Sequence, residues 1–263
     1  MSRFLRLLCR LAGFCAIALC CCLDFVLRLW LLGRAGDRHR RTAWTHFWGC
    51  QLQRLLNIQI TVHGTPPTRG LLACNHLSYL DIVVLAACQP LVFVSKSEVK
   101  RWPMVGQMVV CAGTLFINRE QRADVKRLAA AFAPIIEGGF VVTLFPEGTS
   151  SGGDRVLPFH SSLFEPAAAN RWSAAPAWIG YQVPGGDASE EVAYWKDMTF
   201  LPHLLHLFTL PEIHAQVRFG SAVPEGLNRK QMAKALHQAV CQLAHEGGRK
   251  GMVNSDVVSP VPR

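Results

Sequence analysis

Charge is scarce in this sequence, and the motifs of several large protein classes are missing. Only 17% of the 263 residues are charged, whereas half are hydrophobic. This composition excludes a globally disordered chain. It supplies a sizeable core and leaves apolar residues for surface beyond that core. The length fits one large α/β domain or two small ones.

Metal and disulfide patterns are also missing, although the chain has ten cysteines. Five of them lie in an apolar N-terminal stretch, and the other five each have apolar neighbours. Outside that stretch, no two cysteines have the Cys-x-x-Cys spacing of a zinc or redox site. We therefore interpret the cysteines as small buried thiols in a reducing compartment, and we expect no bound metal.

Acidic residues are outnumbered, and the basic excess is concentrated near the N-terminus. Residues 1–41 contain eight Arg and two Asp, which gives +6 of the net charge of +9. The other 222 residues contain 19 basic and 16 acidic side chains, which gives +3. Zinc-finger spacings and RNA-binding aromatic motifs are absent, so nucleic acid is not an expected partner. Basic residues beside an apolar stretch instead favour an anionic membrane surface.

The apolar N-terminal stretch has about the length of a bilayer span. Residues 11–23 are uncharged, and the stretch reaches residue 32 if Asp24 and Arg28 are allowed. These two lie four apart, so on a helix they can pair and reduce the cost of burying charge. About 20 apolar residues span a bilayer. We favour a membrane helix, spanning or re-entrant, over an interfacial amphipathic helix or a cleaved signal peptide.

Short apolar runs alternate with helical patterns along the rest of the chain. This alternation predicts a single α/β domain whose central, largely parallel sheet is flanked by helices. We expect a membrane anchor with basic flanks at 1–41, the α/β domain at 42–246 and a flexible C-terminal tail at 247–263. Strands are predicted at residues 58–63, 71–74, 91–94, 113–117, 140–145, 175–181 and 215–219. Helices are predicted at residues 42–57, 79–88, 120–137, 161–170 and 228–246.

The first segment that bears chemistry follows the predicted strand 71–74. It reads Asn-His-Leu-Ser-Tyr-Leu-Asp, with His76 and Asp81 five positions apart. On a regular helix five steps leave two side chains about 140° apart. The pair therefore meets only if His76 lies in the turn and Asp81 lies in the first turn of the helix. The imidazole would then act as a base that the carboxylate orients, although a His–Asp pair at this spacing also arises often by chance.

A protein nucleophile is not marked in the sequence. Ser78 lies close to His76, but the chain has no Gly-x-Ser-x-Gly motif. We therefore expect the attacking hydroxyl to come from a substrate.

Two further segments follow predicted strands. Phe-Pro-Glu-Gly-Thr at 145–149 presents Glu147, whose carboxylate binds an acceptor hydroxyl, holds a neighbouring site residue or lies in a solvated turn. Gly148 permits close approach of the backbone. Residues 113–119 end in Arg119, whose guanidinium suits a phosphate or carboxylate if it is not simply a surface residue.

Together and in this order, the three segments resemble the glycerolipid (lysophospholipid) acyltransferase family, which includes bacterial 1-acylglycerol-3-phosphate acyltransferases. The Asn-His-x4-Asp block of that family is matched at 75–81 and its Gly-x-x-Phe-Ile-x-Arg block at 113–119. Its Phe-Pro-Glu-Gly-Thr block is matched at 145–149, and a weaker block with a central proline at 175–177. The resemblance covers roughly residues 58–222.

The resemblance implies a glycerol-3-phosphate acyltransferase-like fold and an acyl transfer without a cofactor. In that mechanism His76 is the general base on the acceptor hydroxyl and Asp81 orients it. The implied partners are a lyso-lipid, a membrane and either acyl-CoA or acyl-carrier protein as the acyl donor. The implied place is the inner (cytoplasmic) membrane, with the catalytic domain on its cytoplasmic side. The implied acceptor-binding residues are Arg119, Glu147, Gly148 and Thr149.

One departure from the family concerns the acceptor. Many relatives that use lysophosphatidate have Arg directly after Glu-Gly-Thr, where this chain has Ser150. Residues 150–159 resemble a bacterial subgroup that includes lyso-ornithine-lipid acyltransferases. We expect 1-acylglycerol-3-phosphate as the acceptor, in phospholipid biosynthesis. Lyso-ornithine lipid is the alternative acceptor, and a lipid transacylase or hydrolase using the same site is a further alternative.

Overall fold

The computed structural model of the chain describes residues 2–117 and 130–250. Within these residues seven strands form one sheet in the order β1-β7-β6-β2-β5-β3-β4. Neighbouring strands are parallel except for β6 and β7, which are antiparallel. The expected α/β fold with a largely parallel sheet is confirmed. The strands are β1 (Ile58–His63), β2 (Gly70–Cys74), β3 (Val92–Lys96), β4 (Leu115–Ile117), β5 (Val141–Leu144), β6 (Ala174–Gln182) and β7 (Ile213–Phe219).

Each face of the sheet carries its own apolar core, because successive side chains of a strand point to opposite faces. In β2, Leu72 and Cys74 belong to one core, and Leu71 and Ala73 belong to the other. Every residue of β2 and of β5 is buried. Fully buried apolar strands are typical of the middle of a parallel sheet. The two strands that lead to the His76 and Glu147 segments are therefore inner strands of the sheet.

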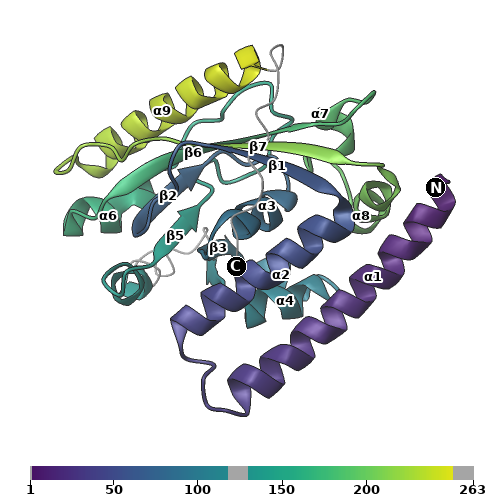
Figure 1. The fold of residues 1–263 in the computed structure, drawn as a ribbon. Helices are drawn as coiled ribbons and strands as arrows, with labels where there is room; N and C mark the ends of the chain where they lie inside the picture. Colours follow the sequence, from purple (N-terminus) through teal and green to yellow (C-terminus); the bar gives the residue numbers. More distant parts are fainter. Residues whose placement is uncertain (1, 118–129, 251–263) are drawn as a thin grey trace.

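Helices cover both faces of this sheet (Figure 1). α9 and α6 lie on one face, whereas α3, α8 and the α1–α2 pair lie on the other. Most of the predicted helix 120–137 lies outside the described residues; of its described residues 130–137, all but the last are helical. The helices are α1 (Arg3–Asp24), η1 (Phe25–Trp30), α2 (Arg38–Leu56), α3 (Leu80–Cys88), η2 (Ser97–Arg101), α4 (Val105–Cys111), η3 (Ser161–Phe164), α6 (Glu165–Asn170), α7 (Ala188–Glu191), α8 (Phe200–Thr209) and α9 (Arg229–Lys250).

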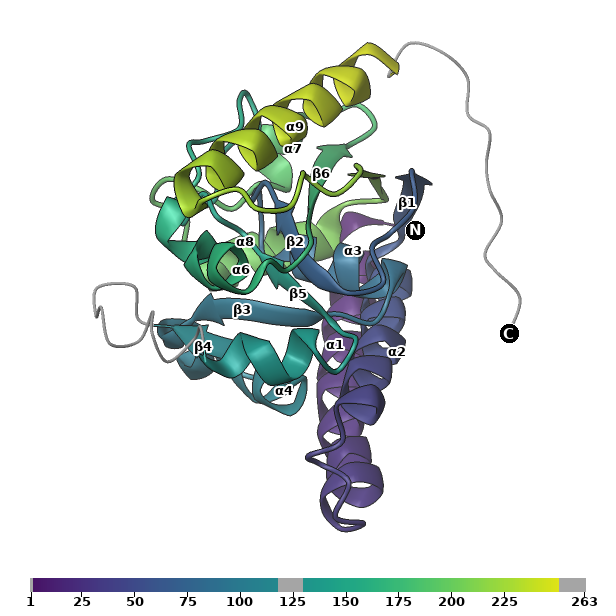
Figure 2. The same ribbon diagram turned by 90° about the vertical axis from the view of Figure 1, so that its left-hand side faces the viewer.

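The N-terminal helices form a hairpin. α1 continues into the π-helical segment η1, so that one apolar helix runs over Arg3–Trp30. α2 returns beside it, and the closed end of the hairpin extends beyond the rest of the molecule (Figures 1 and 2). Asp24 and Arg28 form an ion pair of 2.7 Å, as their spacing predicted. Among residues 2–117 and 130–250, this is the one helix long and apolar enough to cross a membrane.

α1 also packs against the α/β domain. The ring of Phe14 lies 5.5 Å from that of Phe208 in α8. Arg10 is buried and donates hydrogen bonds to the carbonyls of Phe208 and Leu210, and to that of Pro211 at 3.2 Å. These carbonyls lie at the C-terminal end of α8, where carbonyl groups have no partner inside the helix. The expected anchor therefore shares a core with the domain that follows it.

Two helices extend past the expected domain boundaries. α2 begins at Arg38 because Asp37 caps it, accepting a hydrogen bond from the backbone N–H of Arg40 at 3.3 Å. α9 continues to Lys250, so residues 247–250 are helical. The remaining part of the expected tail lies outside the described residues.

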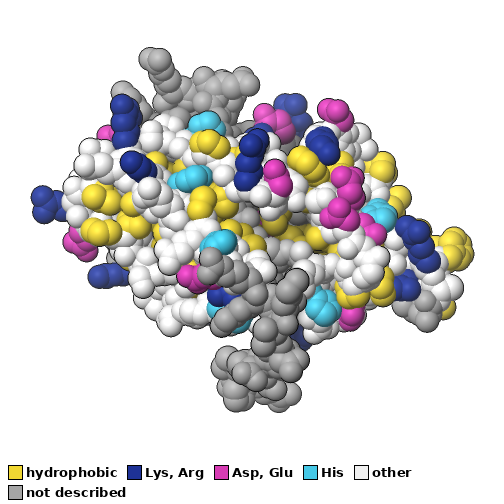
Figure 3. Space-filling model, turned by 90° about the horizontal axis from the view of Figure 1, so that it is seen from above, with side chains coloured by type: hydrophobic (Ala, Val, Ile, Leu, Met, Phe, Trp, Pro, Cys, Tyr) yellow, Lys and Arg dark blue, Asp and Glu magenta, His cyan; other side chains and the backbone are white. Residues whose placement is uncertain are grey.

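The hairpin and the α9 side of the molecule have different surfaces. Seen from above Figure 1, basic, acidic and apolar side chains are interspersed around α9 (Figure 3). The hairpin instead exposes a run of large apolar side chains, which marks an interface or a membrane contact. These are Phe4, Leu5, Leu8, Leu11, Leu19, Leu23, Val26, Leu27, Trp30, Leu31, Leu32 and Phe47.

Candidate active site

His76 lies just beyond the carboxyl end of β2, in the turn that leads to α3. Its Nδ1 is 2.7 Å from Oδ2 of Asp81, the second residue of α3. The turn is closed by a hydrogen bond of 3.0 Å from the Asp81 amide to the Ser78 carbonyl. This is the arrangement that a five-residue spacing demands, with the histidine in the turn and the aspartate in the first turn of the helix. The catalytic role of the pair stays a prediction.

Asp81 is fully buried and accepts four hydrogen bonds. Besides His76, Oδ2 accepts from the backbone amides of Leu77 at 2.8 Å and Ser78 at 3.1 Å. Oδ1 accepts from the hydroxyl of Tyr181 at 2.8 Å. These donors compensate for burying the charge. They also hold the carboxylate in one orientation, with Oδ2 toward the imidazole.

The imidazole of His76 is partly exposed to solvent, whereas the carboxylate of Asp81 is not. The side chain of His76 is 24% exposed and that of Asp81 is 0% exposed. The His76 ring stacks on Phe145, with centroids 4.3 Å apart and planes 22° apart. Because Nδ1 is taken by Asp81, Nε2 is the nitrogen left for a substrate. The geometry fits a general base whose tautomer and direction are set by a carboxylate.

Glu147 reaches the same turn from the end of β5. Its side chain is buried, and Oε1 accepts a hydrogen bond of 3.1 Å from the backbone N–H of His76. Burial raises the pKa of Glu147 from 4.5 to about 7, against the backbone amides of His76 and Leu157, which lower it. Glu147 therefore does not lie in a solvated turn, and its contact supports the role of holding a neighbouring site residue. Its contact with an acceptor stays a prediction.

The loop after β5 runs along the His76 turn. Gly148 has φ +80°, a conformation that side chains with a Cβ rarely adopt. The amide of Ser151 donates to the His76 carbonyl at 3.0 Å, which joins the loops after β2 and β5. Thr149 is exposed in this loop. Arg119 lies outside the described residues, so its part in acceptor binding stays a prediction.

Two further side chains belong to the site, and sequence reasoning gave neither of them a role. Oδ1 of Asn75 accepts from the Ile179 amide at 2.8 Å, and its Nδ2 donates to the Ile179 carbonyl at 2.9 Å. Tyr181, two residues further along β6, is the donor to Asp81. The sequence did point to Asn75, because it stands directly before His76 in the Asn-His-x4-Asp segment. Tyr181 had none, because it lies 100 residues from Asp81.

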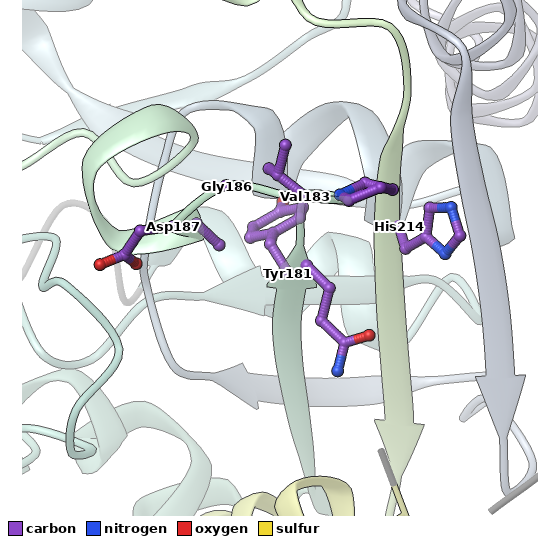
Figure 4. A pocket seen from close by; sticks show the side chains of 8 residues that line it. Tyr181, Val183, Gly186, Asp187 and His214 are labelled. Carbon is purple, nitrogen blue, oxygen red and sulfur yellow. The ribbon is translucent and has the colours of Figure 1, made fainter. Parts of the chain in front are cut away.

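An open pocket lies at the carboxyl end of β6 (Figure 4). Tyr181 lines it from β6 and His214 lines it from β7, with Val183, Gly186 and Asp187 on the segment after β6. Tyr181 therefore belongs both to the wall of this pocket and to the hydrogen bonds around Asp81.

Residues 59–180 match a family model described as Acyltransferase. The lyso-ornithine lipid O-acyltransferase of Rhizobium meliloti is 33% identical over 238 residues, which cover 84% of this chain and 77% of that protein. The chain belongs to the lysophospholipid acyltransferase family. The acyltransferase is also 32% identical, over 77% of its own length and 78% of the relative's, to the lyso-ornithine lipid O-acyltransferase of Pseudomonas aeruginosa.

Another relative is named for a different acceptor. The 1-acyl-sn-glycerol-3-phosphate acyltransferase of Neisseria gonorrhoeae is 42% identical over 101 residues, which cover 38% of this chain and 40% of that protein. Among solved structures, the 1-acyl-sn-glycerophosphate acyltransferase of Thermotoga maritima has a TM-score of 0.66 over 94% of the acyltransferase and 98% of that chain. At 18% identity, this likeness confirms the fold.

Proposed function

We propose that the acyltransferase moves a fatty acyl group from an acyl thioester to the free hydroxyl of a lyso-lipid, with His76 as the general base. The observation that carries this proposal is the 2.7 Å contact between Nδ1 of His76 and the buried carboxylate of Asp81. It leaves Nε2 to meet an acceptor hydroxyl. Acyl-CoA and acyl-carrier protein both supply the thioester that this chemistry needs.

In the proposed reaction His76 moves a single proton twice. Nε2 takes the proton of the acceptor hydroxyl as that oxygen attacks the thioester carbonyl carbon. The tetrahedral adduct then collapses, the carbon–sulfur bond breaks, and the imidazolium returns the proton to the leaving thiolate. Asp81 stabilises the imidazolium without taking the proton. Glu147 holds the His76 turn through its backbone amide.

Two observations favour an acceptor lipid whose head group is not a phosphomonoester. Ser150 stands where many lysophosphatidate acyltransferases have Arg, and its hydroxyl donates to the Tyr194 carbonyl, which closes the loop after β5 onto the segment before α8. The relatives that match most of the chain are named for lyso-ornithine lipid, whose amino-acid head group needs no guanidinium for a phosphate. We therefore propose lyso-ornithine lipid as the acceptor. The identity to the Neisseria gonorrhoeae enzyme keeps 1-acylglycerol-3-phosphate, the acceptor expected first, as the second candidate.

We also propose that the enzyme works at the cytoplasmic face of a membrane, held there by the α1–α2 hairpin. The apolar side chains that the hairpin exposes support the membrane contact. The five cysteines of the α/β domain are free thiols, which supports a reducing compartment for the domain.

The test offers both acceptors to the full-length protein in lipid–detergent micelles, with acyl-CoA and acyl-carrier protein in turn, and identifies products by mass spectrometry. We expect a diacyl product that requires the thioester, and a higher kcat/KM for lyso-ornithine lipid. His76→Ala should lower kcat by about 10³-fold, the rate that a general base contributes. His39→Ala, which changes an exposed histidine of α2, is the matched control and should leave activity unchanged.

Three results would contradict this proposal. Full activity of His76→Ala would exclude His76 as the base. A diacyl product formed from lyso-lipid alone would show transacylation, and release of free fatty acid would show hydrolysis.

A further inference from the structure

Tyr181 makes a contact with Asp81 that the proposed mechanism does not yet use. Three of the four hydrogen bonds to Asp81 end on Oδ2 and come from the His76 turn itself. Oδ1 has one donor in the described part of the chain, the hydroxyl of Tyr181 at 2.8 Å. Asp81 itself is fully buried, so its Oδ1 depends on the donor that the fold places beside it. An unpaired carboxylate oxygen at such a place is costly.

The fold fixes Tyr181 at this position through the register of β6. β6 pairs with β2 up to Cys74 and Ala177, and then runs past the end of β2 beside the His76 turn. There the side chain of Asn75 clamps both backbone groups of Ile179. Ile179 and Tyr181 point to the same face of the strand, toward the core that also contains α3. Asn75 thus fixes β6 relative to the His76 turn, and with it the position at which the Tyr181 hydroxyl contacts Asp81.

The hydroxyl of Tyr181 is held as a proton donor. Burial raises the pKa of Tyr181 well above 10, and the nearby Asp81 carboxylate raises it further. Of the titratable groups in the described chain, His76 contacts Oδ2 of Asp81, and Glu147, Cys74 and Cys88 lie near Asp81 or Tyr181. Asp187 and His214 line the pocket beside Tyr181. On Oδ1 itself the donor is the Tyr181 hydroxyl, so Tyr181 is the group that shares the negative charge there.

We infer that Tyr181 is a positioning residue of the acyltransferase, which fixes Asp81 so that Oδ2 stays on Nδ1 of His76 and which limits how strongly Asp81 attracts the imidazole proton. This inference rests on the proposed roles of His76 and Asp81. Without the Tyr181 hydroxyl, the carboxylate can rotate and both oxygens compete for the same donors. The negative charge of Asp81 is then shared with fewer donors. Asp81 therefore stabilises the protonated form of the His76 imidazole more strongly than in the wild type.

The first test compares Tyr181→Phe with Tyr194→Phe. The control removes a hydroxyl that has no hydrogen bond to Asp81, and each variant keeps its ring. Tyr181→Phe should lower kcat by about tenfold to a hundredfold, the rate equivalent of one hydrogen bond to a charged group, with KM within about twofold. The acidic limb of its pH–rate profile should move to higher pH, whereas that of Tyr194→Phe should stay where it is in wild type. Tyr181→Phe behaving like Tyr194→Phe in kcat and in pH profile would overturn the inference.

A double-mutant cycle separates positioning from a loss of packing. If Tyr181 acts through Asp81, Tyr181→Phe should have little further effect on kcat when Asp81→Asn is already present. An equal loss in both backgrounds would show that the tyrosine only supports the fold.

A readout without turnover keeps this inference distinct from the proposed function. The His76 signal in 15N-histidine NMR spectra of the full-length protein, identified by its absence in His76→Gln, should titrate at higher pH in Tyr181→Phe than in wild type. If wild type transfers no acyl group but this midpoint shifts, the proposed function fails and the Tyr181–Asp81–His76 linkage stands. If wild type is active and Tyr181→Phe has the same midpoint as wild type, the inference about Tyr181 is wrong and the proposed function stands.

Discussion

Glu147 couples the stability of the fold to pH. Its carboxyl group is buried beside the backbone of His76, and its pKa is raised from 4.5 to about 7. Between those values the folded chain keeps a proton that the unfolded chain has lost. The stability that this group contributes is therefore present below pH 4.5 and is lost as the pH rises through 7.

Replacing Glu147 by Gln should remove this dependence. The amide oxygen still accepts the His76 N–H, but it does not titrate. Between pH 4.5 and 8, we expect the free energy of unfolding of wild type to fall by about 3 kcal/mol more than that of Glu147→Gln. Denaturant unfolding in micelles at several pH values measures the difference. Parallel profiles for the two proteins would show that the Glu147 carboxyl does not titrate in this window.

An exposed glutamate provides the control for that measurement. Glu165 forms an ion pair with Arg229 at 2.9 Å, and both side chains are about half exposed to solvent. Glu165→Gln should change the pH profile by less than about 1 kcal/mol, because exposed ion pairs contribute little.

The parts of the site that sequence could predict are the parts that are local in the chain. His76 and Asp81 lie five residues apart, so turn and helix geometry alone dictated how they meet. Glu147 could be placed at a strand end, but its contact with the His76 amide spans 71 residues. The contact of Tyr181 spans 100 residues and depends on the pairing register of β2 and β6. No local pattern encodes that register.

At the scale of elements, apolar patterns predicted where strands lie better than where they begin. The strand 58–63 was predicted to the residue. The strand predicted from residue 113 begins only at Leu115, because Gly113 has φ +78° and donates to the Val110 carbonyl to end α4. The Asn228 cap of α9 was predicted correctly: its side chain accepts from the amides of the second and third residues that follow.

The exposed apolar side chains of the α1–α2 hairpin predict that it contacts lipid. Leu27 and Trp30 are 59% and 63% exposed near its closed end. Placing Asp at both positions should sharply reduce flotation of the full-length protein with zwitterionic vesicles, because each charge costs about 2.5 to 3.5 kcal/mol in a bilayer core. Val62→Asp changes an exposed apolar residue of β1 and should float like wild type. Undiminished flotation of the Leu27→Asp/Trp30→Asp variant would exclude this end of the hairpin as the contact.

At the scale of the whole molecule, positive charge and apolar surface gather at the same end. Arg34 and Arg40 are exposed beside the closed end of the hairpin, where Trp30 is also exposed. The surface around α9 instead mixes basic and acidic side chains (Figure 3). An anionic leaflet attracts a nearby arginine with about 1 kcal/mol.

Binding to vesicles should therefore depend on lipid charge and on salt. We expect tighter binding to anionic than to zwitterionic vesicles, with the difference shrinking between about 0.1 M and 1 M salt as the Debye length falls from about 10 to 3 Å. Arg34→Gln/Arg40→Gln should reduce that difference in a flotation assay. Lys230→Gln/Lys234→Gln removes the same charge from exposed positions of α9 and should keep it. Equal behaviour of the two double variants would exclude a local electrostatic contact.

The sheet order has a consequence for how the enzyme is made. β2, which leads to His76, lies between β5 and β6, and both of these are synthesised later. A nascent chain that ends before residue 141 contains the Asn-His-x4-Asp segment but neither of the strands that flank it. Parallel partners pair only after the intervening crossovers are in place, so the chain must wait to close these long loops. The hairpin up to Leu56 is complete long before that. The growing polypeptide thus completes its apolar hairpin first, and the two strands that flank the His76 turn are both present only after residue 182 has been synthesised.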